Sequence, residues 1–333
     1  MNLSALETLP YELLEPIFLL SGCNIALLKA SPYLGMRFSN LDIYNSSCDA
    51  QLTRVQPINT NRSANQTVIF ASRWMTWTFF KSWIMRRFKQ AGCLCGSTPD
   101  EGCFDAQWPP DFEDITQMTY SRCHLPRLAF LKARLPKKLL QGPWTQDKVQ
   151  FLRFLLWITS MTVDWADSET RQLVSNAKNL AIIEKNLEVV ELFNHNRRLG
   201  RAPDMDLVRF AVLDAGCDRS VIYDTLFSVD MWGSSTASRD CPLLDAWCND
   251  RIKEDDPKGQ WLRTKLQEFR RIPDRHRVTQ REGQLPVYRA EINSATGDYD
   301  AGIEDYLIAN QLAWDKVSVS DLNLAMLSTM VNK

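Results

Sequence analysis

Cysteine and histidine, the residue types that most often bind zinc, gather between residues 93 and 124. Cys93 and Cys95 flank a single leucine, Cys103 follows, and Cys123 stands next to His124. A tetrahedral zinc site usually draws its ligands from two close pairs, with about two to four residues between the members of a pair. The spacing here does not match that pattern. The favoured interpretation is therefore reduced thiols in a loop and in core contacts, and we expect neither a metal nor another cofactor.

Histidine could also serve as a general base, and the chain has three: His124, His195 and His276. None has a cysteine, serine or aspartate at a spacing that favours nucleophilic catalysis, although such groups can also meet from distant positions. The sequence contains no glycine-rich phosphate loop, nucleophile elbow or H-E-x-x-H motif. We therefore expect a protein that is not an enzyme. An enzyme that uses a thiol or zinc is kept as an alternative hypothesis, and it predicts bound metal or a reactive cysteine.

The composition is that of an ordinary globular protein. The 333 residues correspond to about two domains, and 45% apolar with 24% charged residues are enough to bury a core. A formal net charge of −1 argues against a protein held to nucleic acid by phosphate neutralisation. The most apolar window, residues 68–85, is interrupted by Arg73 and Lys81, so it does not predict a membrane span.

Cysteine usage and the N-terminal residues bear on the compartment. Nine cysteines, an odd number without regular spacing, favour a reducing environment over a disulfide framework. Residues 1–7 lack the basic and apolar regions of a secretory signal. We expect a cytoplasmic or nuclear protein with no membrane partner and no nucleic-acid partner.

Three short helices are expected in the first forty residues. The apolar residues that repeat at helical spacing in the first of them are Leu13, Leu14, Ile17 and Phe18. Pro16 fits a regular helix only near its first turn, which places the helix start near Leu13. Gly22 can end this helix, and a second apolar run covers residues 25–30. Ser31 and Pro32 can cap and open the third helix.

These helices bury too little surface to be stable alone, since units below ~40 residues usually need a staple or a partner. Their apolar content also exceeds what they can hide from water. We therefore expect an exposed apolar face, the usual mark of an interface, made of Leu9, Pro10, Leu13, Ile17 and Leu20.

At these residues the chain resembles the F-box of fungal F-box proteins. The matching pattern is Leu9-Pro10-x-Glu12-Leu13-Leu14-x-x-Ile17-Phe18, followed by Ala30-Ser31-Pro32-x-Leu34-Gly35. The resemblance implies docking to the Skp-type adaptor of a cullin–RING (SCF) ubiquitin ligase, while the rest of the chain selects a protein substrate. It also implies that the adaptor contacts, or the core beneath them, come from Leu9, Pro10, Leu13, Leu14, Ile17 and Phe18.

One feature of the family is missing. The Trp-Arg pair common near the end of the third helix is replaced by Met36-Arg37-Phe38. The alternative interpretation is that residues 9–38 are the N-terminal helices of a larger bundle.

The following region contains a polar stretch and an aromatic one. Residues 45–67 have no apolar period and predict a linker or mobile loop. Residues 69–89 predict one helix, with Trp77, Ile84 and Phe88 on one stripe and basic residues around it. Aromatic and basic residues together could bind single-stranded nucleic acid. We favour an amphipathic helix that buries its aromatic rings against the N-terminal helices.

Helical hairpins are expected after the Gly142-Pro143 break. Residues 181–193 resemble the core of an ankyrin repeat, and a similar apolar pattern returns about thirty residues later, over residues 207–222. Lys185 stands where the family has a turn glycine, the second unit carries about two extra residues, and no T-P-L-H motif precedes either helix. Stacked hairpins of this kind expose a long surface suited to protein partners.

The expected protein is all-α, with an N-terminal three-helix F-box-like unit followed by an ankyrin-like region of helical hairpins. The predicted divisions are residues 1–45 (F-box-like), 46–140 (linker and aromatic, basic helical segment), 141–271 (helical repeats) and 272–333 (extended segment and terminal helices). The leading functional hypothesis is a non-catalytic SCF substrate receptor for an unknown protein substrate. The alternative is an ankyrin-like interaction scaffold that binds no adaptor.

Overall fold

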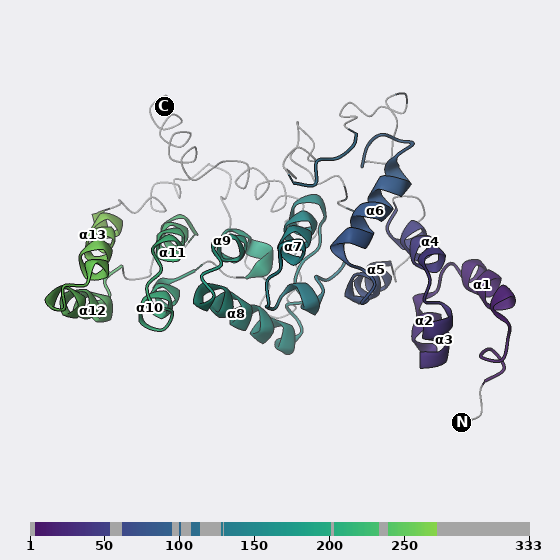
Figure 1. Ribbon diagram of the computed structural model, residues 1–333, viewed down its shortest axis with the longest axis horizontal. Coiled ribbons are helices and arrows are strands. Elements are labelled where there is room, and N and C mark those ends of the chain that lie inside the picture. The colour runs from purple at the N-terminus through teal and green to yellow at the C-terminus, as the bar shows by residue number, and fades with distance from the viewer. Residues whose placement is uncertain are drawn as a thin grey trace, which may run out of the picture. The chain divides into compact units, whose positions relative to one another are not determined.

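The computed structural model describes residues 4–53, 62–94, 100, 108–113, 128, 130–200, 203–232 and 239–271. Across this part of the chain the α-helix is the dominant element, with thirteen α-helices, so the all-α prediction is confirmed (Figure 1). The chain divides into two compact units. Among the described residues, the first unit holds the chain up to Leu139 together with Gln146–Val163, and the second holds Leu140–Thr145 and the chain from Asp164 onward. The terminal helices expected within residues 272–333 lie outside the described residues.

The first unit begins with four helices: α1 (Tyr11–Leu20), α2 (Ile25–Ala30), α3 (Pro32–Arg37) and α4 (Leu41–Gln51). Ser31 caps α3 by accepting a hydrogen bond from the Leu34 amide, and Pro32 is its first residue, as predicted. Gly22 ends α1 with a φ of 73°. Its amide and that of Cys23 donate to the carbonyls of Leu19 and Phe18, which are the two hydrogen bonds of a Schellman motif.

The predicted start of α1 near Leu13 is wrong. The helix begins at Tyr11, because the Pro10 carbonyl already accepts hydrogen bonds from the amides of Leu13 and Leu14. Pro16 therefore lies inside the helix, where its missing N–H removes the hydrogen bond to the Glu12 carbonyl. Glu12 is exposed, so water can reach that carbonyl.

The predicted linker and the single aromatic helix are also wrong in part. Within residues 45–67, α4 continues to Gln51 and α5 (Arg62–Ala71) has already begun. The aromatic segment forms two helices, because Thr76 accepts a hydrogen bond from the Phe79 amide and so caps a new helix, α6 (Trp77–Phe88). An N-cap residue inside an apolar pattern marks the start of a new helix, and helical periodicity alone does not show this boundary.

The aromatic residues of α6 form the core of the first unit. Trp77, Phe80, Trp83 and Phe88 are each at most 4% exposed. They pack on α7 (Gln146–Ile158), with the Trp77 and Phe80 rings 5.5 Å and 5.3 Å from the Phe151 ring. The expected burial is observed, and the partners include α7 and Phe70 of α5 as well as α4, through Asp49.

An extended segment supports this core beside α5. Leu131, Ala133 and Leu135 exchange backbone hydrogen bonds with residues 160–162, on one side of the segment. On its other side, the amides of Lys132 and Arg134 donate to the side chains of Gln66 and Thr67 of α5. The 3₁₀ turn that follows, Lys137–Leu139, brings the Lys138 ammonium to the Met75 carbonyl at 2.8 Å, and burial lowers the pKa of Lys138 to about 8.

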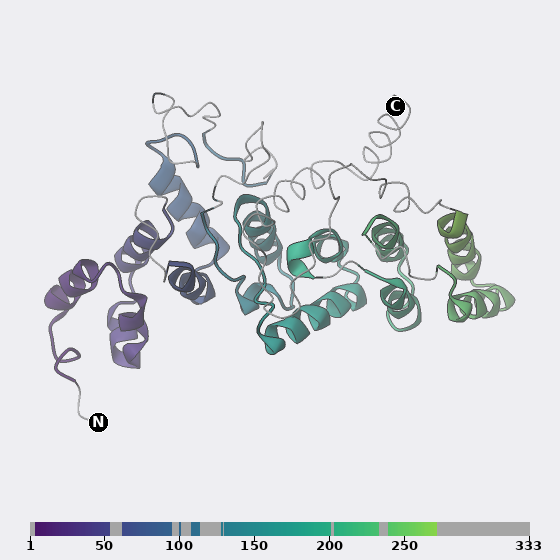
Figure 2. The ribbon, with the colours of Figure 1, turned by 180° about the vertical axis from the view of Figure 1, so that it is seen from behind.

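The second unit consists of three consecutive helical hairpins: α8 (Ser168–Ile183) with α9 (Leu187–His195), α10 (Met205–Leu213) with α11 (Arg219–Trp232), and α12 (Pro242–Lys253) with α13 (Pro257–Arg271). Seen from either side, α8, α10 and α12 follow one another in one layer and α9, α11 and α13 in the other (Figures 1 and 2). The 3₁₀ turn Arg197–Leu199 follows α9. The N-cap of α8 is Asp167, whose carboxylate accepts a hydrogen bond from the Glu169 amide.

The hairpin turns explain why the sequence repeat is irregular. In the first turn Lys185 adopts a φ of 53°, the left-handed conformation in which a glycine was expected, and Asn186 caps α9. The turn between α10 and α11 needs two such residues, Gly216 and Cys217, and is correspondingly longer. The two extra residues noted in the sequence therefore lie in this turn.

Candidate protein-docking surface

Helix α1 has a buried face and an exposed apolar face. Leu14 and Phe18, one helical turn apart, are both 0% exposed. Leu13, Ile17 and Leu20 are 52%, 38% and 88% exposed, and the spacing of three and four residues places them on one stripe. Helix α1 therefore combines an anchored side with an apolar side that meets solvent.

The six residues predicted for adaptor contact divide between these faces. Leu13 and Ile17 belong to the exposed stripe, and Pro10 is exposed just before it. Leu14 and Phe18 belong to the core, while Leu9 is partly buried and packs against that core. The expected exposed face is thus observed except at Leu9.

The core beneath the stripe is closed by the other short helices. Phe18 packs on Phe38 with a ring distance of 5.1 Å, and Leu34 and Ile43 complete the same cluster. Phe38 belongs to the Met36-Arg37-Phe38 segment, and its ring fills the end of α3. Gly35 allows the close packing of α2 and α3, because a Cβ there would stand 2.9 Å from the Leu28 carbonyl oxygen.

Polar contacts fix the start of α1 against α3 and against the N-cap residue of α4. Arg37 donates to the Leu9 carbonyl at 3.4 Å and to the Tyr33 hydroxyl at 2.9 Å. Asn40 donates to the Tyr11 hydroxyl at 2.6 Å while its own side chain caps α4. Desolvation raises the pKa of the Tyr11 hydroxyl, so it stays a neutral partner at physiological pH. The apolar stripe therefore lies on a helix whose position is fixed by these side-chain hydrogen bonds.

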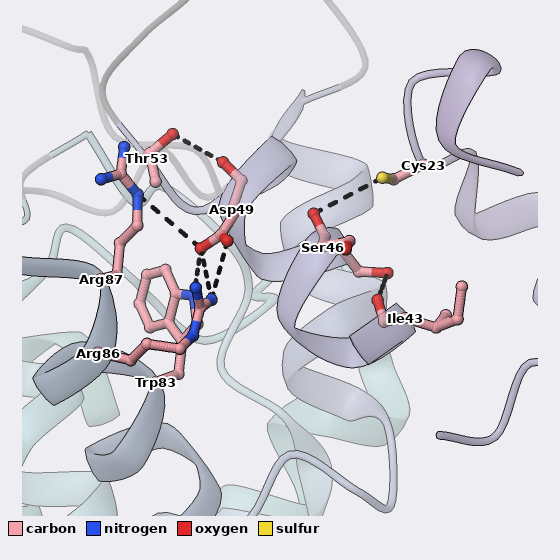
Figure 3. Close-up of polar contacts among 9 residues, drawn as sticks. Cys23, Ile43, Ser46, Asp49, Thr53, Trp83, Arg86 and Arg87 are labelled. Atoms are coloured by element: carbon pink, nitrogen blue, oxygen red, sulfur yellow. Dashed lines mark hydrogen bonds and ion pairs between the residues drawn. The ribbon is translucent and has the colours of Figure 1, made fainter. Parts of the chain in front are cut away.

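Asp49 joins the end of α4 to α6. Its carboxylate accepts a hydrogen bond from the indole nitrogen of Trp83 at 2.8 Å and two from Arg86 at 2.8 and 3.0 Å (Figure 3). Arg87 lies farther away, at 3.8 Å. The N-terminal helices are therefore connected to the aromatic core by a buried indole and not by sequence continuity alone.

We expect Asp49→Ala to destabilise the first unit by about 1–3 kcal/mol, the usual cost of leaving a buried donor such as the Trp83 indole unpaired. Arg86 is 47% exposed, so its ion pair contributes little, and Arg86→Ala should cost under about 1 kcal/mol. Urea unfolding of both variants measures the difference. Equal losses of unfolding free energy in the two variants would show that the ion pair with Arg86, and not the hydrogen bond from the Trp83 indole, accounts for the contribution of Asp49.

The cysteine and histidine cluster is only partly within the described residues. Cys93 is buried. Cys95, Cys103, Cys123 and His124 lie outside the described residues, so the structure does not show whether they meet. Among the residues that it does describe, no group of three or more acidic, cysteine or histidine side chains could hold a metal ion.

The structure brings together one polar group that the sequence did not reveal. His195 Nε2 lies 2.6 Å from Asp224 Oδ1 and 3.1 Å from Ser228 Oγ, and Asn194 donates to the other oxygen of Asp224 at 2.8 Å. Asp224 and Ser228 contact the same ring nitrogen. In a catalytic triad the acid and the nucleophile contact opposite nitrogens. The group joins α9 to α11.

Two other features bear on binding classes. Four rings of α6 that could stack on bases, those of Trp77, Phe80, Trp83 and Phe88, are buried, while Phe79 is half-buried. No helix in the described part of the chain is both long enough and apolar enough to cross a membrane.

Comparison with known proteins found no matching family model, curated protein or solved structure.

Proposed function

We propose that this protein is an F-box substrate receptor that docks the Skp-type adaptor of an SCF ubiquitin ligase. The observation that carries the proposal is the exposed apolar stripe of α1, held over a closed core in a segment whose sequence resembles the F-box. A helix that shows such a stripe suits the helix-in-groove mode of protein recognition. Adaptor contacts would come from Pro10, Leu13 and Ile17, with Leu9 at the edge and Leu14 and Phe18 holding the helix in place.

The second unit would select the substrate. Stacked helical hairpins present long surfaces of side chains, and we assign these three to degenerate ankyrin-like repeats. In this role the chain needs no catalytic residue of its own, since the partner subunits perform the transfer of ubiquitin. Such a receptor would act in the cytoplasm or the nucleus. The substrate would be a protein.

The direct test is whether the purified full-length chain binds a purified Skp-type adaptor. Calorimetry and gel filtration measure this binding. A stable equimolar complex supports the proposal. Failure to bind adaptor, while the chain is folded by circular dichroism, would contradict it and favour the second candidate, an ankyrin-like scaffold that acts without an adaptor. The stacked hairpins of the second unit favour that candidate, because such hairpins present a surface suited to protein partners without any adaptor.

A further inference from the structure

A proline lies on the exposed face of α1. Pro16 follows Leu13 by three residues and precedes Leu20 by four, and all three side chains are exposed. Residues at these spacings are neighbours on one side of a helix. Pro16 therefore lies beside the apolar stripe of Leu13, Ile17 and Leu20, within the surface that the adaptor would cover.

Pro16 leaves one backbone acceptor of this surface without its helical donor. In a regular helix the carbonyl of residue 12 accepts from the amide of residue 16, but proline has no N–H. The Glu12 carbonyl points along the helix towards Pro16, so its oxygen opens at the edge of the stripe. Among the residues that the structure describes, no side chain donates to this oxygen. The surface of α1 thus offers a hydrogen-bond acceptor next to exposed apolar side chains.

The fold itself does not explain this proline. Proline is the least favourable residue inside a helix, far below alanine. Helix α1 forms in spite of it, since Leu14 and Phe18 anchor the opposite face in the core. Pro16 is exposed and is not part of that core. Its place in the helix is therefore better explained by a contact outside the chain.

The charge around the free acceptor is negative. Glu12 and Glu15 are the charged residues of α1, which contains no lysine or arginine. Arg37 of α3 reaches the start of α1, but it donates to the Leu9 carbonyl and to the Tyr33 hydroxyl. A hydrogen bond from a cationic donor is stronger than one from a neutral donor, and nearby carboxylates favour the cation. The complementary donor is therefore a lysine or an arginine.

We propose that the adaptor places a lysine or arginine side chain on the Glu12 carbonyl, where Pro16 leaves it without a helical donor. This polar contact would lie beside the apolar contacts of Leu13 and Ile17 and would set the position of α1 along the groove. A helix without the proline would leave the adaptor's cation unpaired, so the contact favours this chain over such helices. The role of the contact rests on the proposed function, because it concerns the same surface and the same partner.

The decisive variants are Pro16→Ala and Pro16→Val, which restore the amide and return the Glu12 carbonyl to the helix. Calorimetry with the purified full-length chain and a purified Skp-type adaptor measures the affinity. We expect both variants to bind about tenfold more weakly, from the loss of one charge-assisted hydrogen bond. Valine keeps an apolar side chain of similar size. A loss of affinity in Pro16→Ala alone would show that the adaptor uses the proline ring and not the carbonyl, and would overturn the proposal.

The charge of the donor is tested at Glu12. Glu12→Gln should weaken binding by up to about fivefold and make the affinity less sensitive to NaCl, because it removes a carboxylate close to the cation. Glu191→Gln removes an exposed carboxylate of α9 and should leave the affinity and its salt dependence unchanged. An unchanged salt dependence in Glu12→Gln would exclude a cationic donor and overturn the proposal.

The stability of the free chain separates binding from folding. Pro16→Ala should raise the midpoint of thermal unfolding or leave it unchanged, because alanine restores a helical hydrogen bond. A lowered midpoint would show that the proline serves the fold, and would overturn its assignment to binding. If the wild-type chain binds no adaptor, the proposed function fails together with this contact. If the wild type binds and both Pro16 variants bind equally well, only the contact fails.

Discussion

Replacing Leu13 and Ile17 together by alanine is expected to weaken adaptor binding by about 100-fold while leaving the fold intact. Truncating a large apolar residue at the centre of an interface commonly costs ~1–2 kcal/mol, and each 1.4 kcal/mol corresponds to tenfold in Kd. Leu13 and Ile17 are 52% and 38% exposed, so their removal should change the free energy of unfolding by little more than about 0.5 kcal/mol. Calorimetry with the adaptor and urea unfolding of the free chain measure the two quantities.

Two further variants make this result interpretable. Leu19→Ala with Leu243→Ala removes two other exposed leucines, 43% and 62% exposed, one on α1 away from the stripe and one on α12. We expect adaptor binding to be unchanged in this control. Phe18→Ala opens the core beneath α1 and should cost about 3–5 kcal/mol, with loss of binding through unfolding of the short helices. Wild-type affinity in the Leu13 and Ile17 variant would contradict docking through the stripe.

Gly259→Ala is expected to destabilise the third hairpin by about 1–3 kcal/mol, the usual cost of forcing an extra methyl group into a packed interface. A Cβ at this position would stand 2.7 Å from the Arg251 Cβ, 2.8 Å from the Cys248 carbonyl oxygen and 2.9 Å from the Ile252 amide nitrogen. Two of these contacts are with backbone atoms, which cannot rotate away. Helices α12 and α13 would have to separate.

Hydrogen exchange monitored by mass spectrometry gives the location of this effect. We expect faster exchange in α12 and α13 of the Gly259→Ala variant and unchanged exchange in the first unit. Gln260→Ala changes the next, exposed residue of the same helix and serves as the control, with an expected effect within about 0.5 kcal/mol. Since alanine favours a helix over glycine by ~1 kcal/mol, a Gly259→Ala variant as stable as wild type would show that the helices can move apart at little cost.

The sequence predicted features that depend on neighbouring residues. Ser31 with Pro32 and Gly22 marked helix ends correctly, because capping and the left-handed turn involve groups only a few residues apart. The alternation of buried and exposed residues on α1 follows in the same way from the period of 3.6 residues. Leu13, Ile17 and Leu20 therefore fell on the expected, exposed side.

Other features depended on which helix faces meet. The start of α1 at Tyr11 and the break before α6 differ from the prediction, because the Pro10 carbonyl and the Thr76 hydroxyl accept hydrogen bonds from the first turns of these helices. Asp49 with Trp83, and His195 with Asp224, are pairs separated by about thirty residues. Local spacing in the sequence does not predict such pairs, because the two residues come into contact only when the helices pack.

The amino-acid sequence by itself determined the helical class, the ends of several helices and the residues available for an apolar stripe, since these follow from periodicity and capping within a few residues. Only the tertiary structure decided that Leu9 is partly buried, and that Gly259 lets the backbones of α12 and α13 approach closely. It also brought Asp224 and Ser228 to the same ring nitrogen of His195, whereas a catalytic triad uses both ring nitrogens. Each of these facts depends on the distance between segments far apart in the chain, which packing alone sets.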